Sequence, residues 1–282
     1  MDSINETFLK AKEEGRKIVM LACYDYPSAL MAEKASIDSI LVGDSLAMTV
    51  LGYDSTLQVS MREMLIFCEA VSRALKRTFL IADMPFLSYQ LGLEKALENA
   101  GKFIRRGAKA VKLEGGKEIA PLVKALVDAG IPVMGHIGLL PQYAYLKGGF
   151  KYKGREAREA LNLFEDAIAL ERAGVFSIVL EAISAEVAKS ITENLKVPTI
   201  GIGSGPNCDG QILVFHDLLG LFERFKPKYV KQYANLSETI LKALSSYREE
   251  VLNNIYPDDE HSYHMSDDEY RKFLELLSKN ER

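Results

Sequence analysis

Five apolar runs in this chain end on ionisable side chains, and those positions carry the chemistry that the sequence can support. The first of these runs ends at Gly43 and is followed by Asp44 and Ser45; the others end on Asp83, on Lys112 with Glu114, on His136 and on Glu181. Charged side chains are rarely buried unless they are paired, so core packing alone does not explain the repetition. The pattern predicts strands whose C-terminal ends bring functional groups together.

Three of these residues, Asp44, Asp83 and Glu114, would place carboxylates at one rim, where their mutual repulsion has to be offset. Ligation by oxygen alone, without cysteine, suits a hard divalent cation, and Mg²⁺ above all. Lys112 and Glu114 are two positions apart, so in a strand they point to the same face. We therefore predict a Mg²⁺ site made by the three carboxylates.

The remaining groups suit an organic acid. Lys112 can hold a substrate carboxylate, Ser45 can donate a hydrogen bond to the same molecule, and His136 can orient it or polarise its carbonyl. Glu181 can serve as a general base if burial raises its pKa toward neutrality. Together these residues predict a site that binds a 2-oxo acid on Mg²⁺ and removes the proton from the adjacent carbon to give an enolate. What the enolate attacks does not follow from them.

Each of these assignments has a structural alternative. A single Asp after an apolar run, such as Asp44, often caps a helix or forms a turn. Lys112 and Glu114 could form an ion pair inside a barrel. His136 could be a hydrogen-bonded packing residue.

Other motifs fit packing or surface roles at least as well. His216 is expected to be structural, and the spacing of His261 and His264 resembles a metal pair, although their polar surroundings favour a surface or subunit contact. The glycines between 201 and 205 would allow phosphate binding or, more simply, close packing. Residues 143–153, rich in aromatics, Gly and Lys, are predicted to form a lid over a site.

Apolar runs alternate with helical patterns along most of the chain, without hairpin signals. This order predicts parallel strands, and an α/β fold of the (β/α)8 TIM barrel type with an extra N-terminal helix and C-terminal helices. Ser3 and Glu6 form the capping box of the first helix, and the eighth strand, 211–217, has the least regular pattern. A doubly wound sheet is the alternative, but its G-x-G-x-x-G fingerprint is missing. We expect one barrel domain over 1–282, with 257–282 an extension used in subunit contacts.

Composition narrows the class of partner. The 282 residues include 35 basic and 39 acidic side chains, a net charge of -4, which gives no basic surface for nucleic acid. No stretch is apolar enough to span a membrane, and the N-terminus lacks the pattern of a signal peptide. The three cysteines are far apart and fit small buried residues of a reducing compartment. These features predict a cytoplasmic enzyme for small molecules.

Several long motifs resemble the ketopantoate (3-methyl-2-oxobutanoate) hydroxymethyltransferase family. The resemblance runs from about Lys17 to His264 through the segments ACYDYPSA, ILVGDSLAMTVLGYDST, ADMPFLSYQ, AVKLEGG, PVMGHIGLLPQ, TIGIGSGPNCDGQILVFHDLLGL and DEHSYH. It implies transfer of a hydroxymethyl group from 5,10-methylenetetrahydrofolate to 3-methyl-2-oxobutanoate, giving 2-dehydropantoate for pantothenate and coenzyme A synthesis. It also implies a (β/α)8 barrel that assembles as a homodecamer, with C-terminal helices, such as 266–279, crossing between subunits.

The same resemblance assigns roles position by position. It implies one Mg²⁺ per subunit on Asp44, Asp83 and Glu114, oxo-acid contacts from Asp44, Ser45, Asp83 and Lys112, and a proton acceptor at Glu181. The chain departs from the family pattern in two places that remove no chemical group. Ala47 stands where Gly is usual, and Ser204 stands where Ala is usual.

Two further functions are compatible with the same residues. A Mg²⁺-dependent lyase or mutase acting on an oxo acid, of the kind found in the isocitrate lyase and phosphoenolpyruvate mutase group, would need no folate. An oligomeric barrel that only binds an oxo acid as a regulator would need no base, and Glu181 argues against it.

Overall fold

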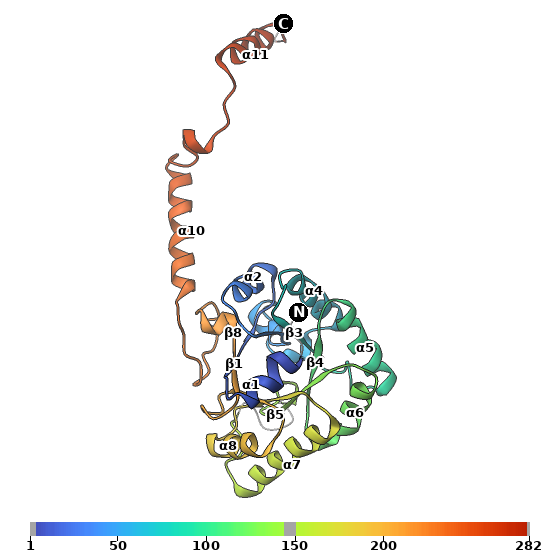
Figure 1. Cartoon of the computed structure of the whole chain (residues 1–282). Coiled ribbons are helices and arrows are strands. Elements are labelled where there is room, and N and C mark those ends of the chain that lie inside the picture. The colour runs from blue at the N-terminus through green and yellow to red at the C-terminus, as the bar shows by residue number, and fades with distance from the viewer. Residues whose placement is uncertain (1–3, 144–150, 281–282) are drawn as a thin grey trace. The chain divides into compact units, whose positions relative to one another are not determined.

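The computed structural model describes residues 4–143 and 151–280, and within residues 4–234 it has a closed barrel of eight parallel strands in sequence order (Figure 1). Flanking helices follow most strands, which confirms the predicted (β/α)8 fold. The strands are β1 (Ile18–Ala22), β2 (Ser39–Val42), β3 (Phe79–Asp83), β4 (Ala110–Glu114), β5 (Val133–Gly138), β6 (Ser177–Glu181), β7 (Thr199–Ile202) and β8 (Gly210–Val214).

The strands are short and apolar because both of their faces are covered. Every residue of β2 to β5 is buried, which is what a parallel strand between a filled interior and outer helices requires. The register then sets which strand ends are neighbours. Asp83 lies opposite Lys112, and Glu114 lies opposite His136.

The helices begin and end where local sequence signals place them. Ser60 and Glu63 form a capping box at the start of α4, the side chain of Asp25 accepts a hydrogen bond from the Ser28 amide at the start of α2, and Gly174 ends α7 in the left-handed conformation. The α-helices of the barrel unit are α1 (Lys10–Glu13), α2 (Tyr26–Lys34), α3 (Leu46–Thr49), α4 (Met61–Ser72), α5 (Leu93–Arg105), α6 (Ala120–Asp128), α7 (Ala157–Ala173), α8 (Ala185–Asn194) and α9 (Phe215–Leu218).

Shorter helical turns lie between these elements. They are η1 (Asn5–Leu9), a π-helix that continues into α1, and the 3₁₀ turns η2 (Thr56–Gln58), η3 (Lys117–Ile119) and η4 (Pro141–Tyr143). Two expectations need comment. The proposed Ser3 cap lies outside the described residues. The eighth strand exists but ends at Val214, so His216 and Asp217 belong to the short helix α9 instead.

The N-terminal helical segment closes the end of the barrel opposite the carboxyl ends of the strands. Phe8 is fully buried and meets Phe79 and Phe176 edge to face, with ring centroids 5.5 Å and 4.9 Å away. Burying one such ring contributes roughly 2–3 kcal/mol. The extra helix is therefore part of the core.

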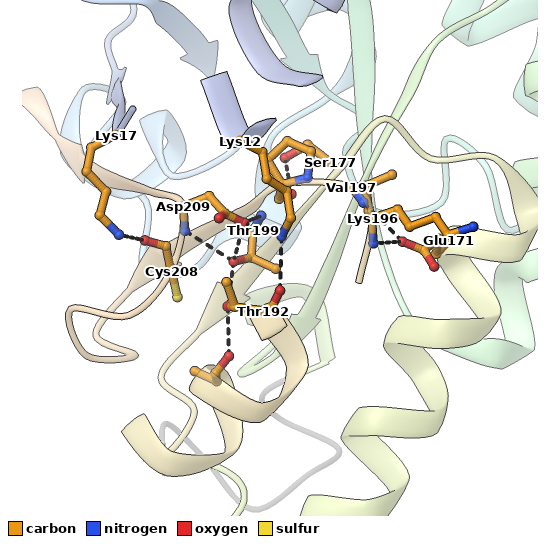
Figure 2. Close-up of polar contacts among 12 residues, drawn as sticks. Lys12, Lys17, Glu171, Ser177, Thr192, Lys196, Val197, Thr199, Cys208 and Asp209 are labelled. Carbon is orange, nitrogen blue, oxygen red and sulfur yellow. Dashed lines mark hydrogen bonds and ion pairs between the residues drawn. The ribbon is translucent and has the colours of Figure 1, made fainter. Parts of the chain in front are cut away.

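Polar contacts join the same helix to the last two strands (Figure 2). The Lys12 ammonium lies 2.8 Å from Asp209 Oδ2 and donates to the Thr192 carbonyl at 3.0 Å. The same Asp209 oxygen accepts from the Thr199 amide at 2.8 Å. These contacts stabilise the end of the barrel at which catalysis is not expected.

The remainder of the chain, 235–282, is a second compact unit. It contains α10 (Leu236–Leu252), the 3₁₀ turn η5 (Asp259–His261) and α11 (Asp267–Asn280). His261 and His264 are exposed there. Among the described residues, no helix is long and apolar enough to cross a bilayer. Cys23, Cys68 and Cys208 are buried and free, as predicted.

Candidate active site

One cavity of about 1180 Å³ opens at the carboxyl ends of the strands, and all the predicted site residues line it. They lie in the C-terminal halves of four strands, β3 to β6, or in the turn just after β2, and they share one rim because parallel strands of a barrel all point the same way. These residues are Asp44, Ser45, Asp83, Lys112, Glu114, His136 and Glu181. The cavity is larger than a five-carbon acid requires.

Asp44 and Asp83 face each other across the ends of β2 and β3. The Asp44 amide donates a hydrogen bond to Asp83 Oδ2 at 3.1 Å, and both residues are 3 % exposed. Burial, together with repulsion from Asp83, raises the pKa of Asp44 to about 7, although the Lys112 charge opposes the rise. Two carboxylates held this close favour binding of a cation or a proton.

Lys112 places a positive charge among the carboxylates. Its Nζ lies 2.7 Å from Asp83 Oδ1, and the ion pair is almost completely buried. Burial disfavours the ammonium, but attraction from Asp83, Glu114 and Asp44 outweighs it, so the pKa of Lys112 is raised. The partner of Lys112 is thus Asp83, and no ion pair joins Lys112 to Glu114 among the described contacts.

Glu114 is 1 % exposed, and one of its two carboxylate oxygens has a hydrogen bond. Its Oε2 accepts from the Gln142 amide at 3.0 Å, whereas its Oε1 has no hydrogen-bond partner among the described residues. Burial and the Asp44 charge raise its pKa well above the usual value. An unpaired buried carboxylate oxygen is costly, so this atom is a candidate ligand for a cation.

His136 lies between Lys112 and Glu181. Its Nδ1 is 3.0 Å from Lys112 Nζ, and its Nε2 is 3.2 Å from Glu181 Oε2, although that second contact lacks hydrogen-bond geometry. Burial, with the adjacent Lys112 charge, lowers the pKa of His136 well below its usual value. The imidazole is therefore neutral at pH 7.

Glu181 is the last residue of β6, the strand between β5 and β7, and its side chain lines the cavity. Burial raises the pKa of its carboxyl to about 7, and the positive charge of Lys112 offsets part of that rise. The backbone beside it is held by Ser204, whose hydroxyl donates to the Leu180 carbonyl at 2.7 Å and accepts from the Ile183 amide at 3.0 Å. A carboxyl with a pKa near neutrality can both accept and return a proton at pH 7.

Ser45 has a partner that sequence reasoning did not identify. Its Oγ is 2.7 Å from the Tyr24 hydroxyl, and the Tyr24 ring stacks on the His216 imidazole with centroids 5.6 Å apart. Tyr24 is fully buried, so the pair fixes the position of the serine hydroxyl at the edge of the cavity.

The carboxylates do not form a ready metal cage in this conformation. Among the described residues, no group of three or more His, Cys, Asp or Glu side chains converges closely enough to hold an ion. The donor set nevertheless fits a hard dication. Glu114 Oε1 is buried without a hydrogen bond among the described residues, whereas Asp83 Oδ1 is paired with the Lys112 ammonium and Asp44 accepts from Gln142.

Three further residues matter to the site and were missed. Gln142 bonds to Asp44, Tyr89 bonds to Gln142, and Asp217 lines the cavity with its pKa raised to about 6 by burial. Gln142 ends the motif HIGLLPQ, which begins in β5. A polar residue so soon after the carboxyl end of a strand could have indicated from the sequence that Gln142 belongs to the site. Tyr89 carried no comparable signal because it closes no apolar run, whereas Asp217 closes the predicted eighth strand, 211–217, and the same pattern could have indicated it.

The glycines between 201 and 205 lie against protein. A Cβ on Gly203 would lie 2.6 Å from the Tyr229 ring, and one on Gly205 would lie 2.6 Å from the Ala185 side chain. Close packing therefore accounts for both glycines. Of the predicted lid, 144–150 lies outside the described residues; at its end, Lys153 donates its amide to the Ala182 carbonyl at 2.7 Å.

Comparisons with known proteins agree with this geometry. The family model described as ketopantoate hydroxymethyltransferase matches residues 3–259. The 3-methyl-2-oxobutanoate hydroxymethyltransferase of Moorella thermoacetica is 56% identical over 253 residues, which cover 89% of this chain and 94% of that protein. The enzyme of the same name from Syntrophobacter fumaroxidans is 55% identical over 270 residues, 95% of this chain and 96% of that protein.

A solved structure shows that the fold is shared more widely. The 2,3-dimethylmalate lyase, a member of the PEP mutase/isocitrate lyase superfamily, superposes with a TM-score of 0.59 at 17% identity, over 100% of this chain and 98% of that one. At this identity the likeness concerns the fold alone. The family match and the close relatives, in contrast, extend over nearly all of the chain and bear out the motif resemblance: this chain is a hydroxymethyltransferase enzyme and belongs to the ketopantoate hydroxymethyltransferase family.

Proposed function

We propose that this enzyme transfers a hydroxymethyl group from 5,10-methylenetetrahydrofolate to 3-methyl-2-oxobutanoate, with Glu181 as the base and Mg²⁺ on Asp44, Asp83 and Glu114. The observation that carries the proposal is the placement of Glu181, a carboxyl with a pKa near 7, in the same cavity as the three other carboxylates and Lys112. The names of the close relatives support the substrate.

An unpaired oxygen and mutual repulsion make the carboxylates suited to binding a cation. Glu114 Oε1 has no hydrogen bond among the described residues, and burial with mutual repulsion raises the pKa of both Asp44 and Glu114. A dication would remove that repulsion and satisfy the Glu114 oxygen. When bound, Mg²⁺ would polarise the oxo group and make the neighbouring C–H more acidic.

The residues of the chain supply the other steps. Lys112 and Ser45 hold the substrate carboxylate and carbonyl, and His136, as a neutral imidazole, keeps Glu181 and Lys112 in place. The Glu181 carboxylate takes the proton from C3, and the electron pair of that bond moves toward the C2 oxygen. C3 then bonds to the methylene carbon of the folate as one of the two carbon–nitrogen bonds of that carbon breaks. Water displaces the second nitrogen and provides the hydroxyl group, and the two freed nitrogens take up the proton removed from C3 and the proton lost by the water. The space of the cavity beyond these residues accommodates the donor.

Deuterium exchange at C3 of 3-methyl-2-oxobutanoate tests the proposal. We expect Mg²⁺-dependent exchange without folate, and 2-dehydropantoate only when the folate donor is added. Glu181→Gln should abolish the exchange and leave binding of the oxo acid largely intact. Exchange that persists undiminished in the variant would exclude Glu181 as the base, and wild-type exchange without transfer would exclude the donor.

We also propose that the enzyme is a cytoplasmic homodecamer in which α11 makes subunit contacts. Four apolar side chains of α11 recur at helical spacing and are each about half exposed in the single chain: Tyr270, Phe273, Leu274 and Leu277. An apolar stripe of this kind is the signature of a helix that packs on another surface. Phe273→Asp should reduce the oligomer mass measured by light scattering, and an unchanged mass would exclude this helix from the interface.

A further inference from the structure

Gln142 makes a set of contacts that no proposed catalytic role explains. It lies in η4, just after β5, and its side chain is buried at 3 % exposure. Its Nε2 donates to Asp44 Oδ2 at 2.8 Å and to the Met84 carbonyl at 3.0 Å, and its Oε1 accepts from the Tyr89 hydroxyl at 3.2 Å. The side-chain amide of Gln142 thus joins the segment after β5 to the segments after β2 and β3.

These partners leave the amide a single orientation. Both hydrogens of Nε2 are directed to oxygens that only accept, a carboxylate and a carbonyl, whereas Oε1 meets a hydroxyl that can donate. A flipped amide would place its oxygen against Asp44 and Met84, leaving two buried acceptors without donors. The Asp44 carboxylate and the Met84 carbonyl therefore determine which atom of Gln142 faces Asp44, because the one hydrogen of the Tyr89 hydroxyl is shared with the Glu114 carbonyl at 2.9 Å.

The backbone of the same residue reaches a second carboxylate. The Gln142 amide nitrogen donates to Glu114 Oε2 at 3.0 Å, so Gln142 bonds to one oxygen of Asp44 and one oxygen of Glu114. Glu114 Oε1 has no hydrogen bond among the described residues. Gln142 thus holds one oxygen of Asp44 and one oxygen of Glu114. Because both oxygens of a carboxylate move together, these bonds also restrict the position of the second oxygen of each group.

We propose that Gln142 is a positioning residue for the divalent cation: it anchors Asp44 through its side chain and Glu114 through its backbone, and so preorganises two ligands before the ion enters. This inference rests on the proposed Mg²⁺ site. Groups that orient metal ligands commonly change metal affinity by roughly 10–100-fold when they are removed. Gln142 contacts neither the proposed base nor Lys112 in any described contact. Replacing Gln142 should therefore change the affinity for the cation more than the proton transfer itself.

Direct measurement of metal binding to the full-length enzyme tests the proposal. Gln142→Met keeps an unbranched side chain of similar length but removes both the donor and the acceptor. We expect its dissociation constant for Mg²⁺ by calorimetry, and for Mn²⁺ by electron paramagnetic resonance, to rise roughly 10–100-fold. Saturating Mg²⁺ should then return the C3 exchange rate to within a few-fold of wild type.

Gln211→Met is the matched control. Gln211 lines the same cavity, but its amide donates to the Gly205 carbonyl at 2.9 Å and contacts none of the carboxylates in the described structure. The Gln211→Met enzyme should bind the metal with the same affinity as wild type. Equal affinities for wild type and Gln142→Met would overturn the inference, as would an exchange defect in Gln142→Met that saturating Mg²⁺ does not relieve.

Tyr89→Phe provides a second variant in case Gln142→Met does not fold, which thermal unfolding without metal would show. It removes one hydroxyl, which contacts Gln142 Oε1 at 3.2 Å and the Glu114 carbonyl at 2.9 Å, and it should weaken metal binding in the same direction by a smaller factor. Wild-type affinity in this variant would contradict the anchoring argument. Absence of cation binding in wild type itself would instead overturn the proposed Mg²⁺ site, so the two failures are distinguishable.

Discussion

His136 Nδ1 lies 3.0 Å from the ammonium nitrogen of Lys112. An ammonium group can only donate, so Nδ1 must carry the lone pair and Nε2 must carry the hydrogen of this neutral imidazole. Nε2 is also the atom that lies 3.2 Å from Glu181 Oε2. The buried lysine thus determines which proton the histidine presents to the proposed base.

Two substitutions of His136 separate its two contacts. His136→Gln can place an amide N–H near the position of Nε2, whereas His136→Asn can place only an acceptor near Nδ1. If the N–H beside Glu181 matters, Asn should lower the C3 exchange rate about 10²-fold, the usual effect of misplacing a catalytic group, and Gln should lower it less. The measurement is exchange at saturating substrate. Equal losses would assign the role of His136 to the Lys112 contact.

Glu181 should make the enzyme less stable as the pH rises. Its folded-state pKa of about 7 lies above the ordinary value of 4.5, so between these pH values the folded state binds more protons than the unfolded state. This contribution to stability is present below pH 4.5 and is lost as the pH rises through 7. Glu181→Gln, which cannot ionise, should therefore gain stability relative to wild type by up to about 3 kcal/mol at pH 8 compared with pH 4.5.

Urea unfolding with a chelator present measures this difference. Glu193→Gln, at an exposed position near the end of α8, is the control for the loss of one glutamate carboxylate. A Glu181→Gln difference that is constant with pH would show that the Glu181 carboxyl titrates normally in the folded enzyme.

In this chain, Ser204 should stabilise the backbone on either side of the base, at a position where the family resemblance gives Ala. Ser204→Ala leaves the Ile183 amide without its acceptor and the Leu180 carbonyl without its donor, on either side of Glu181. We expect a stability loss of about 1–3 kcal/mol together with slower C3 exchange.

Ser177→Ala is the matched control for that change. Ser177 begins the same strand, and its hydroxyl donates to the Pro198 carbonyl at 2.8 Å, at the opposite end from the cavity. It should lose stability but keep its exchange rate. Slower exchange in both variants would mean that general loosening of β6, and not the local bonds of Ser204, affects the base.

The lysines of the N-terminal helix should differ in their contribution to stability. Lys12 is 17% exposed and binds both Asp209 and the Thr192 carbonyl, whereas Lys10 is 49% exposed and pairs with Glu6 at 3.4 Å. Lys12→Met should lower the free energy of unfolding by about 1–3 kcal/mol because it removes charged, partly buried hydrogen bonds. Lys10→Met should change it by less than about 0.5 kcal/mol. Equal urea midpoints for the two variants would contradict this ranking.

The sequence by itself determined the barrel and the common location of the seven predicted site residues. Apolar runs of strand length alternate with helical segments, which permits few folds, and in a barrel all strands open at the same rim. Residues that follow those runs, from Asp44 to Glu181, therefore had to share one cavity. That inference needed only the pattern of the chain, because strand direction and side-chain alternation are local properties.

Tertiary structure decided the pairing within the cavity. Lys112 pairs with Asp83 because the register of β3 and β4 places the two residues opposite each other, a relation that no local pattern encodes. Gln142 bonds to Asp44 across 98 positions of sequence, and Tyr89 reaches Gln142 across 53. Such contacts depend on the closure of the barrel, which brings together loops that the sequence leaves independent.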